Sequence, residues 1–178
     1  LFKFAKQKYL ALRSIGQPFN LTVLTLGMHF PDGYLSPSCP VQYGDYRDSI
    51  VCTVSLLSDF IEFVEKNDTR YDTEIVIVGD HLTMKSSVAK KMEDDHHREI
   101  FNMFMSRSLS RQVNRQEIDH FDLFPSILSA LDISMKNGQA GLGCSGLGKV
   151  PCGSLVNEPL INSKISKHSD FYDSLWVQ

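Results

Sequence analysis

The chain has 178 residues, of which 42% are hydrophobic and 22% are charged, with a formal net charge of -3. This length and composition predict a single globular domain over residues 1–178, and the weak negative charge without a basic stripe argues against a nucleic acid partner. No apolar run approaches the roughly 20 residues that a transmembrane helix needs. The sequence begins at Leu1 without a signal peptide, and we expect it to be a piece of a longer protein.

The first part of the chain predicts a helix, a strand and a long loop. Apolar residues recur at helical spacing over residues 2–15, and Gly16 would end that helix. Residues 19–27 predict a strand. Residues 28–48 are irregular, and a loop of this length inside a compact domain is usually functional or disordered.

The middle of the chain predicts a helix followed by a buried strand. Residues 50–64 carry apolar side chains at spacings of four and three, which is typical of an amphipathic helix, with Asp48 or Ser49 as its N-cap. Residues 74–78 form the near-continuous apolar run of a strand in a parallel sheet. Residues 85–97 are polar and predict a surface segment.

The last part of the chain predicts a strand at residues 99–105 and a helix at 124–131 with Pro125 in its first turn. A glycine-rich loop at residues 138–153 and a polar tail at 157–178 follow. The alternation of helices and strands predicts an α/β fold with a mostly parallel sheet.

The four cysteines fall into two local pairs, Cys39 with Cys52 and Cys144 with Cys152. Each pair flanks a loop rich in glycine, proline or tyrosine, which suits two disulfides formed in an oxidising compartment. Reduced, partly buried thiols would explain the same spacing, so both interpretations stay open. No CxxC spacing occurs, which argues against a structural zinc site.

Ligands of open α/β sheets bind beyond the carboxyl ends of the strands. His29 follows the first predicted strand, His81 follows the second, and His120 precedes the last predicted helix. Asp80 and His81 are adjacent, so a carboxylate oxygen and an imidazole nitrogen could hold one divalent cation if the turn directs both side chains inward. Gly79 would give the backbone that freedom. This ligand pair suits Zn²⁺ or Mn²⁺ better than Ca²⁺.

Each of these residues also has an ordinary explanation. Gly-Asp after a strand is a common turn, and a lone loop histidine is more often hydrogen-bonded than functional. His96 and His97, beside Asp94 and Asp95, offer a second metal site, although so hydrophilic a run is usually a solvated face. The prediction of a site therefore depends on the joint placement of the histidines at one end of the sheet.

Four segments carry motifs of a known family: FNLTVLTLGMHFPDGYLSPSC at residues 19–39, VIVGDHLTM at 76–84, DHFDLFPSILSALDI at 119–133 and GLGCSG at 141–146. Together they resemble the bacterial phosphoglycerol transferases of the alkaline phosphatase and sulfatase superfamily, in the branch that decorates periplasmic glucans. The motifs occur in family order over roughly residues 17–155. The resemblance implies an α/β domain whose mostly parallel sheet is flanked by helices, with its core in that range. It also implies that the N-terminal part of the domain is missing from this sequence.

The resemblance implies roles for individual residues. Asp80 and His81 match the pair that ligates the catalytic divalent metal, Mn²⁺ or Zn²⁺, with Mg²⁺ as a further option. His29 matches the loop histidine that contacts the substrate phosphate. His120 stands where related phosphoethanolamine transferases keep a histidine near the phosphate or a second metal.

The resemblance also implies substrate-binding residues. Asp32 and Gly33 would shape the substrate loop, and Arg98 could face the same rim of the sheet. Cys39 and Cys52 lie where this branch has cysteines.

In such enzymes a metal-activated threonine attacks phosphatidylglycerol, releases diacylglycerol and passes the phosphoglycerol group to a glucan hydroxyl. The resemblance places the threonine and an acidic ligand upstream of the first motif, so this chain alone is expected to be inactive. It implies a location at the periplasmic face of the bacterial inner membrane, with membrane contact through helices preceding Leu1.

Two alternatives stay open. One is another member of the superfamily, such as a phosphoethanolamine transferase, a phosphodiesterase or a sulfatase. The other is a non-catalytic module that keeps the fold and binds a glycan or a lipid headgroup without turnover.

Overall fold

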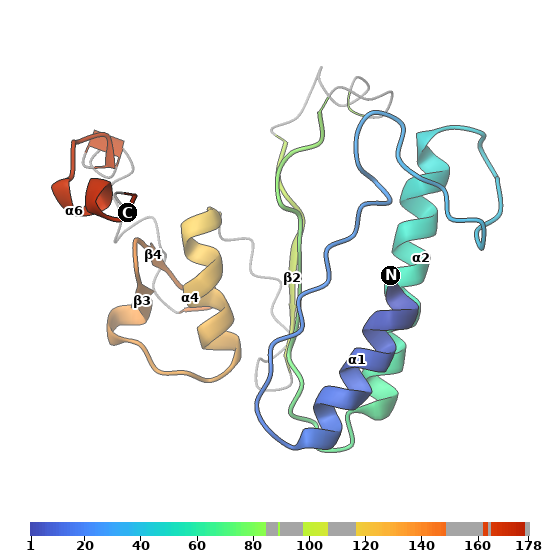
Figure 1. Ribbon diagram of the computed structural model, residues 1–178, viewed down its shortest axis with the longest axis horizontal. Coiled ribbons are helices and arrows are strands. Elements are labelled where there is room, and N and C mark those ends of the chain that lie inside the picture. The colour runs from blue at the N-terminus through green and yellow to red at the C-terminus, as the bar shows by residue number, and fades with distance from the viewer. Residues whose placement is uncertain (85–88, 90–97, 107–116, 149–161, 164, 177–178) are drawn as a thin grey trace. The chain divides into compact units, whose positions relative to one another are not determined.

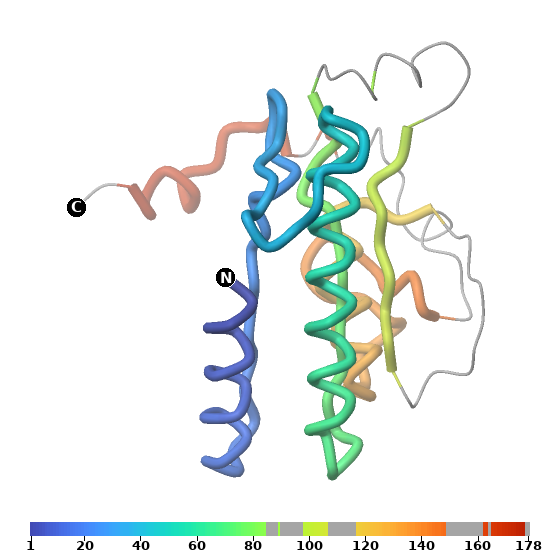
Figure 2. The backbone as a smooth tube through the Cα atoms, turned by 90° about the vertical axis from the view of Figure 1, so that its right-hand side faces the viewer, coloured from blue at the N-terminus to red at the C-terminus, as the bar shows by residue number. Residues whose placement is uncertain are grey.

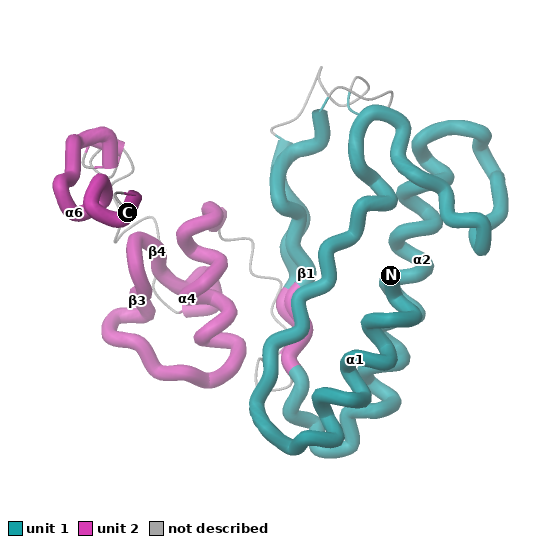
Figure 3. Tube along the Cα trace, viewed as in Figure 1, with its two compact units in different colours: residues 1–73, 77–103 teal, residues 74–76, 104–178 magenta. Residues whose placement is uncertain are grey.

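The computed structural model describes residues 1–84, 89, 98–106, 117–148, 162–163 and 165–176. The chain divides into two compact units, the first made of residues 1–73 and 77–103 and the second of residues 74–76 and 104–178 (Figures 1 and 3). The assignment of the whole chain to one domain stays a prediction.

Helix α1 (Phe2–Ile15) confirms the first predicted helix and ends where the sequence predicts. Gly16 follows with φ 71°, a left-handed conformation that glycine adopts at little cost. Tyr9 is buried, and its ring meets Phe63 of helix α2 (Tyr46–Asn67) edge-on at a centroid distance of 6.4 Å. α1 therefore packs on α2 through its aromatic face.

A polar network joins α1 to the segment that leads into the next strand. Arg13 donates to Asp68 at 3.1 Å and also to Asp72. The buried Asp68 carboxylate accepts the Thr73 amide at 3.1 Å, and the Thr73 hydroxyl is hydrogen-bonded to the Tyr9 hydroxyl at 3.1 Å. These bonds fix the backbone just before the strand that precedes the predicted metal ligands.

The predicted strand at residues 19–27 is not a strand in the structure, although the segment runs as an extended trace (Figure 1). Exposure alternates along it, since Leu24 and Leu26 are exposed while Val23 and Thr25 are half-buried. The alternation of apolar and polar residues therefore predicts the extended backbone of this segment but not whether it pairs with another strand. A strand needs a hydrogen-bonded neighbour, and the described part of the chain places none beside this segment.

Helix α2 begins before its predicted cap. Its N-cap is Asp45, whose carboxylate accepts the Arg47 amide at 2.9 Å. Asp48 lies in the first turn of the helix instead, and its carboxylate bonds to the preceding loop. The prediction of Asp48 or Ser49 as the cap is wrong because all of these residue types suit an N-cap, and the path of the loop decides which of them meets the helix amides.

Strand β1 (Ile75–Val78) confirms the predicted strand to within a residue, and β2 (Asn102–Met105) lies inside the predicted strand at residues 99–105. β1 and β2 pair in a two-stranded sheet. The amide of Gly79, just after β1, donates to the carbonyl of Phe101, just before β2, at 2.9 Å. The end of β1 thus meets the beginning of β2, so the two strands run in opposite directions. The helices and small sheets are compatible with an α/β fold, whereas a mostly parallel sheet is not confirmed in the described residues.

Helix α4 (His120–Ala130) begins four residues before its predicted start at residue 124. A capping box sets this start, because Asp119 accepts the Asp122 amide and Asp122 accepts the Asp119 amide. Pro125 therefore lies inside the helix and not in its first turn, which corrects the prediction. Proline has no N–H, so it cannot donate to the Phe121 carbonyl one turn earlier.

The segment predicted as a glycine-rich loop contains regular structure. The short 3₁₀ helix η1 (Lys136–Gly138) leads into an antiparallel hairpin of β3 (Gln139–Ala140) and β4 (Gly143–Cys144). The residues of this predicted loop beyond Gly148 lie outside the described residues.

Two side chains of α4, Asp122 and Ser126 of the motif segment at residues 119–133, hydrogen-bond the hairpin. The buried Asp122 carboxylate accepts the Cys144 amide at 2.9 Å, and the buried Ser126 hydroxyl accepts the Gly146 amide at 2.9 Å. Unpaired buried polar groups are costly, so these bonds hold the hairpin against the helix. In this unit the motif residues have a structural role.

The predicted polar tail contains a short helix, α6 (Asp170–Ser174), which the Ser169 hydroxyl caps. The predicted surface segment at residues 85–97, except Ala89, and the tail up to residue 161 lie outside the described residues. Among the described helices, none is long and apolar enough to cross a bilayer.

Candidate functional site

Asp80 and His81 follow β1 and bring two metal-ligating atoms together. Asp80 Oδ2 lies 3.6 Å from His81 Nε2. Donor atoms that share one Zn²⁺ at bond lengths of about 2.0–2.2 Å in a tetrahedral arrangement lie roughly 3.3–3.6 Å apart. Both side chains are more than half exposed, at 73% and 56%, so an ion can reach them from solvent.

Hydrogen bonds orient both side chains. His81 Nδ1 lies 2.9 Å from the Leu82 carbonyl, and because a carbonyl only accepts, Nδ1 carries a proton and Nε2 is the ring nitrogen left to ligate a cation. Asp80 Oδ1 accepts the His81 amide at 3.0 Å, which turns Oδ2 toward Nε2. A ligating histidine usually donates its second ring N–H to such an acceptor. The two donor atoms are thus close enough to share one cation, and the metal site itself stays a prediction.

Gly79 is needed here for space and not for an unusual backbone angle. A Cβ at this position would lie 2.8 Å from Ile100 Cγ2, and the residue does not adopt a positive φ. The prediction that glycine gives the turn conformational freedom is therefore wrong. The close approach of Ile100, from the segment before β2, excludes a side chain.

His29 lies in a tight loop closed by backbone bonds. The His29 amide donates to Leu26 at 3.1 Å, and the Tyr34 amide donates to Gly27 at 2.7 Å. His29 Nδ1 lies 2.7 Å from the Phe30 carbonyl, so Nδ1 again carries the proton. The exposed ring therefore presents Nε2 for any contact with a ligand.

The loop that carries His29 and the loop after β1 lie at the same end of the first unit, in two views at right angles (Figures 1 and 2). The placement of His29, His81 and His120 at one rim of a sheet stays a prediction, because residues 19–27 form no strand among the described residues and His120 belongs to the second unit.

The predicted substrate-binding residues have different surroundings. Asp32 is exposed in the His29 loop, whereas Gly33 has φ 68° and lies against Ser49, so a Cβ there would be 2.6 Å from the Ser49 Cβ. Arg98 donates to the carbonyl of Thr83, two residues after His81. Arg98 thus supports the loop that carries Asp80 and His81, and its substrate role stays a prediction.

The remaining candidate ligands lie elsewhere in the chain. His120 is the first residue of α4 in the second unit, where it is exposed. His96 and His97 lie outside the described residues. Within the described part of the chain, no group of three His, Cys, Asp or Glu side chains could hold a metal ion, so Asp80 and His81 stand as a pair.

The Cys39–Cys52 disulfide, which the sequence left open, is present and joins the long loop to α2. Cys52 is buried in the helix, so the bond ties the part of the loop around Cys39 to a rigid element. Cys144 is also disulfide-bonded, while Cys152 lies outside the described residues.

Asp48 binds the end of the same loop, a role that the cap prediction missed. Its buried carboxylate accepts the amides of Gln42, Tyr43 and Gly44 at 2.9, 3.0 and 2.7 Å. Burial by itself raises the pKa of Asp48, but the amide hydrogen bonds outweigh it and hold the pKa below its ordinary value. The available clue in the sequence was an aspartate close to the start of a predicted helix, four residues after Gly44.

We expect Asp48→Asn to lower the melting temperature at pH 7 and to have a smaller effect near pH 3. The folded pKa lies below that of an unfolded aspartate, about 3.9, so ionised Asp48 stabilises the fold above that pH. This stabilisation is lost as the pH falls through the folded pKa. Thermal unfolding by circular dichroism across pH 3–7 would measure it, with the exposed Asp59→Asn on α2 as control. A pH-independent difference would contradict the assignment.

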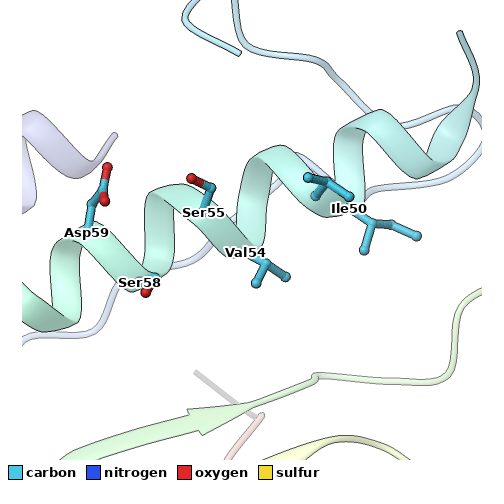
Figure 4. A pocket seen from close by; sticks show the side chains of 6 residues that line it. Ile50, Val54, Ser55, Ser58 and Asp59 are labelled. Carbon is cyan, nitrogen blue, oxygen red and sulfur yellow. The ribbon is translucent and has the colours of Figure 1, made fainter. Parts of the chain in front are cut away.

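An open pocket of about 470 Å³ runs along one face of α2 (Figure 4). None of the predicted site residues lines it, and most of its surface is apolar. Its lining residues are Ile50, Val51, Val54, Ser55, Ser58 and Asp59.

The model of the sulfatase family matches residues 2–133, so this chain belongs to the sulfatase family. It is similar to phosphoglycerol transferase I of Salmonella typhimurium and of Salmonella typhi, with 27% identity over 170 residues that cover 90% of this chain and 21% of each relative. The chain therefore spans about a fifth of the length of these relatives. No solved structure matches it. The resemblance that the motifs predict is confirmed, and the similarity supports a transferase-like member of this superfamily.

Proposed function

We propose that this chain forms part of a metal-dependent phosphoglycerol transferase. In this proposal Asp80 and His81 hold one Mn²⁺ or Zn²⁺, and His29 contacts the transferred phosphate. The observation that carries the proposal is the 3.6 Å separation of Asp80 Oδ2 and His81 Nε2 beyond β1. Similarity to phosphoglycerol transferase I supports the choice of phosphate over sulfate chemistry.

The donor would be the phosphodiester of phosphatidylglycerol. A nucleophilic oxygen, expected from a segment outside this sequence, bonds to phosphorus while the P–O bond to diacylglycerol breaks, and the leaving oxygen takes a proton. A glucan hydroxyl then bonds to phosphorus, loses its proton and releases the nucleophile. A divalent cation bound there would act as a Lewis acid on the phosphoryl oxygens.

His29 has a defined part in this scheme. Because Nδ1 is bonded to the Phe30 carbonyl, Nε2 is the ring nitrogen that would face the phosphate. In the imidazolium form, with a proton on both ring nitrogens, Nε2–H would donate to a phosphate oxygen or give its proton to the leaving oxygen. Asp32, Gly33 and Arg98 would shape the surrounding loops, and His120 would act near the phosphate. We place the whole protein at the periplasmic face of the inner membrane, with a glucan as acceptor.

Titration of the chain with MnCl₂ by calorimetry tests the metal pair. We expect one ion per chain, with modest affinity because the described residues supply two ligands. Asp80→Asn and His81→Gln should each weaken binding by about tenfold or more, since even the outer partners of metal ligands contribute that much. The control is His168→Gln, because His168 also pairs with carboxylates, at 2.9 Å from Asp170 and 3.2 Å from Asp173.

Glycerol phosphate and methyl sulfate then distinguish the two chemistries. The Mn²⁺-loaded chain should bind glycerol phosphate more tightly, and His29→Asn should weaken that binding. Absence of Mn²⁺ binding, or equal weakening in His168→Gln, would overturn the metal site. A preference for the sulfate ester would favour a sulfatase.

A further inference from the structure

The loop that carries His29 lies on one face of α2. Tyr46, Ser49 and Thr53 follow one another at i, i+3 and i+7, so they lie on the same side of the helix. All three are buried. The structure thus gives the loop a continuous support built from one helix.

Two glycines let the loop approach this face closely. A Cβ on Gly27 would lie 2.4 Å from Thr53 Oγ1, and a Cβ on Gly33 would lie 2.6 Å from Ser49 Cβ. Gly33 also has φ 68°. The two ends of the loop are therefore seated against the helix by packing.

Tyr46 contacts the loop at the residue before His29. Its ring is buried, and its hydroxyl donates to the Met28 carbonyl at 2.5 Å. This bond fixes the peptide that enters His29, while the Gly33 amide fixes the peptide that leaves it by donating to the His29 carbonyl at 3.0 Å. With the peptides on both sides of His29 held, the imidazole ring is oriented so that Nδ1 bonds to the Phe30 carbonyl.

We propose that Tyr46 is a positioning residue for His29, holding its backbone so that Nδ1 stays bonded to Phe30 and Nε2 faces outward. The inference takes the role of His29 from the proposed function. The hydrogen bonds that hold His29 do not depend on that function. Tyr46 does not touch the phosphate in this proposal. It acts through the Met28 peptide.

The test compares Tyr46→Phe with Tyr9→Phe in the 178-residue chain. Each substitution removes one hydroxyl from a buried tyrosine of the first unit, and the Tyr9 hydroxyl bonds to Thr73, far along the chain from His29. Nitrogen-15 NMR of the imidazole rings reports the tautomer of His29, and amide exchange reports the His29 and Gly33 bonds.

In Tyr46→Phe we expect the ring shifts of His29 to move toward the average of the two tautomers, and exchange of the His29 and Gly33 amides to rise about tenfold. Tyr9→Phe should leave both unchanged. Unchanged shifts in Tyr46→Phe, or equal changes in both variants, would overturn the inference. Faster exchange at Val64 together with His29 in Tyr46→Phe would also overturn it, because α2 as a whole would then be loosened.

Titration with Mn²⁺ distinguishes a failure of this inference from a failure of the proposed function. Tyr46→Phe should bind Mn²⁺ with the affinity of the parent chain, since the ligands follow β1. A parent chain that binds no Mn²⁺ would overturn the function while the NMR result for Tyr46 still stands.

Discussion

Replacing Cys39 and Cys52 together by serine is expected to lower the free energy of unfolding of the first unit by about 3 kcal/mol. The disulfide closes a loop with a sequence separation of 13 residues, so it restricts the unfolded chain. It also ties the His29 loop to α2. Urea unfolding followed by amide exchange in α2 would measure the loss, because the single tryptophan, Trp176, lies in the second unit.

The reduced parent chain is the control for this prediction. Cys52 is buried, so serine at this position adds a hydroxyl to the core, whereas reduction leaves the thiols in place. The first unit of the reduced parent should therefore lose nearly as much stability as the double variant. A reduced parent as stable as the oxidised one would show that the disulfide contributes little.

Gly143→Ala is expected to destabilise the second unit by about 3 kcal/mol, near the upper end for overpacking. A Cβ there would lie 1.9 Å from the Phe121 carbonyl oxygen and 2.7 Å from the Asp122 amide nitrogen, both of them backbone atoms of α4. The hairpin would have to move away from the helix and would weaken the bond from Cys144 to Asp122. Urea unfolding followed by exchange of the α4 amides would measure the effect.

Gly141→Ala is the matched control, in the same hairpin. Gly141 has φ 63°, but a Cβ at this position would have no atom within 4 Å, so alanine adds only backbone strain of about 1 kcal/mol. A similar cost for both glycines would contradict the close contact between Gly143 and α4.

The sequence predicted features that depend on neighbouring residues. Helical periodicity and Gly16 predicted α1, and an apolar run ending in Gly79 predicted β1 with Asp80 and His81 after it. Adjacent residues must lie close together, so the pairing of a carboxylate with an imidazole needed only a turn that directs the two side chains toward each other. This is why half of the candidate metal site was predictable.

Features that depend on distant segments do not follow from local patterns. Asp48 has the residue type and position of a helix cap, but three loop amides reach its carboxylate. Gly79 suggests backbone freedom, but the structure shows that Ile100 excludes a side chain there. The Asp119 and Asp122 capping box is visible as D-x-x-D, yet Pro125 suggests a later start for the helix.

By itself the sequence determined the family, the main helices and the adjacency of Asp80 and His81 after β1, because motifs and periodicity are local properties of the chain. Only the tertiary structure decided that residues 19–27 stay unpaired in the described part, that β1 and β2 run in opposite directions, and that α2 supports the His29 loop through Tyr46. Each of these depends on which segments meet in space. The free energy of such a contact depends on both of the segments that form it, so the residue pattern of one segment does not predict it.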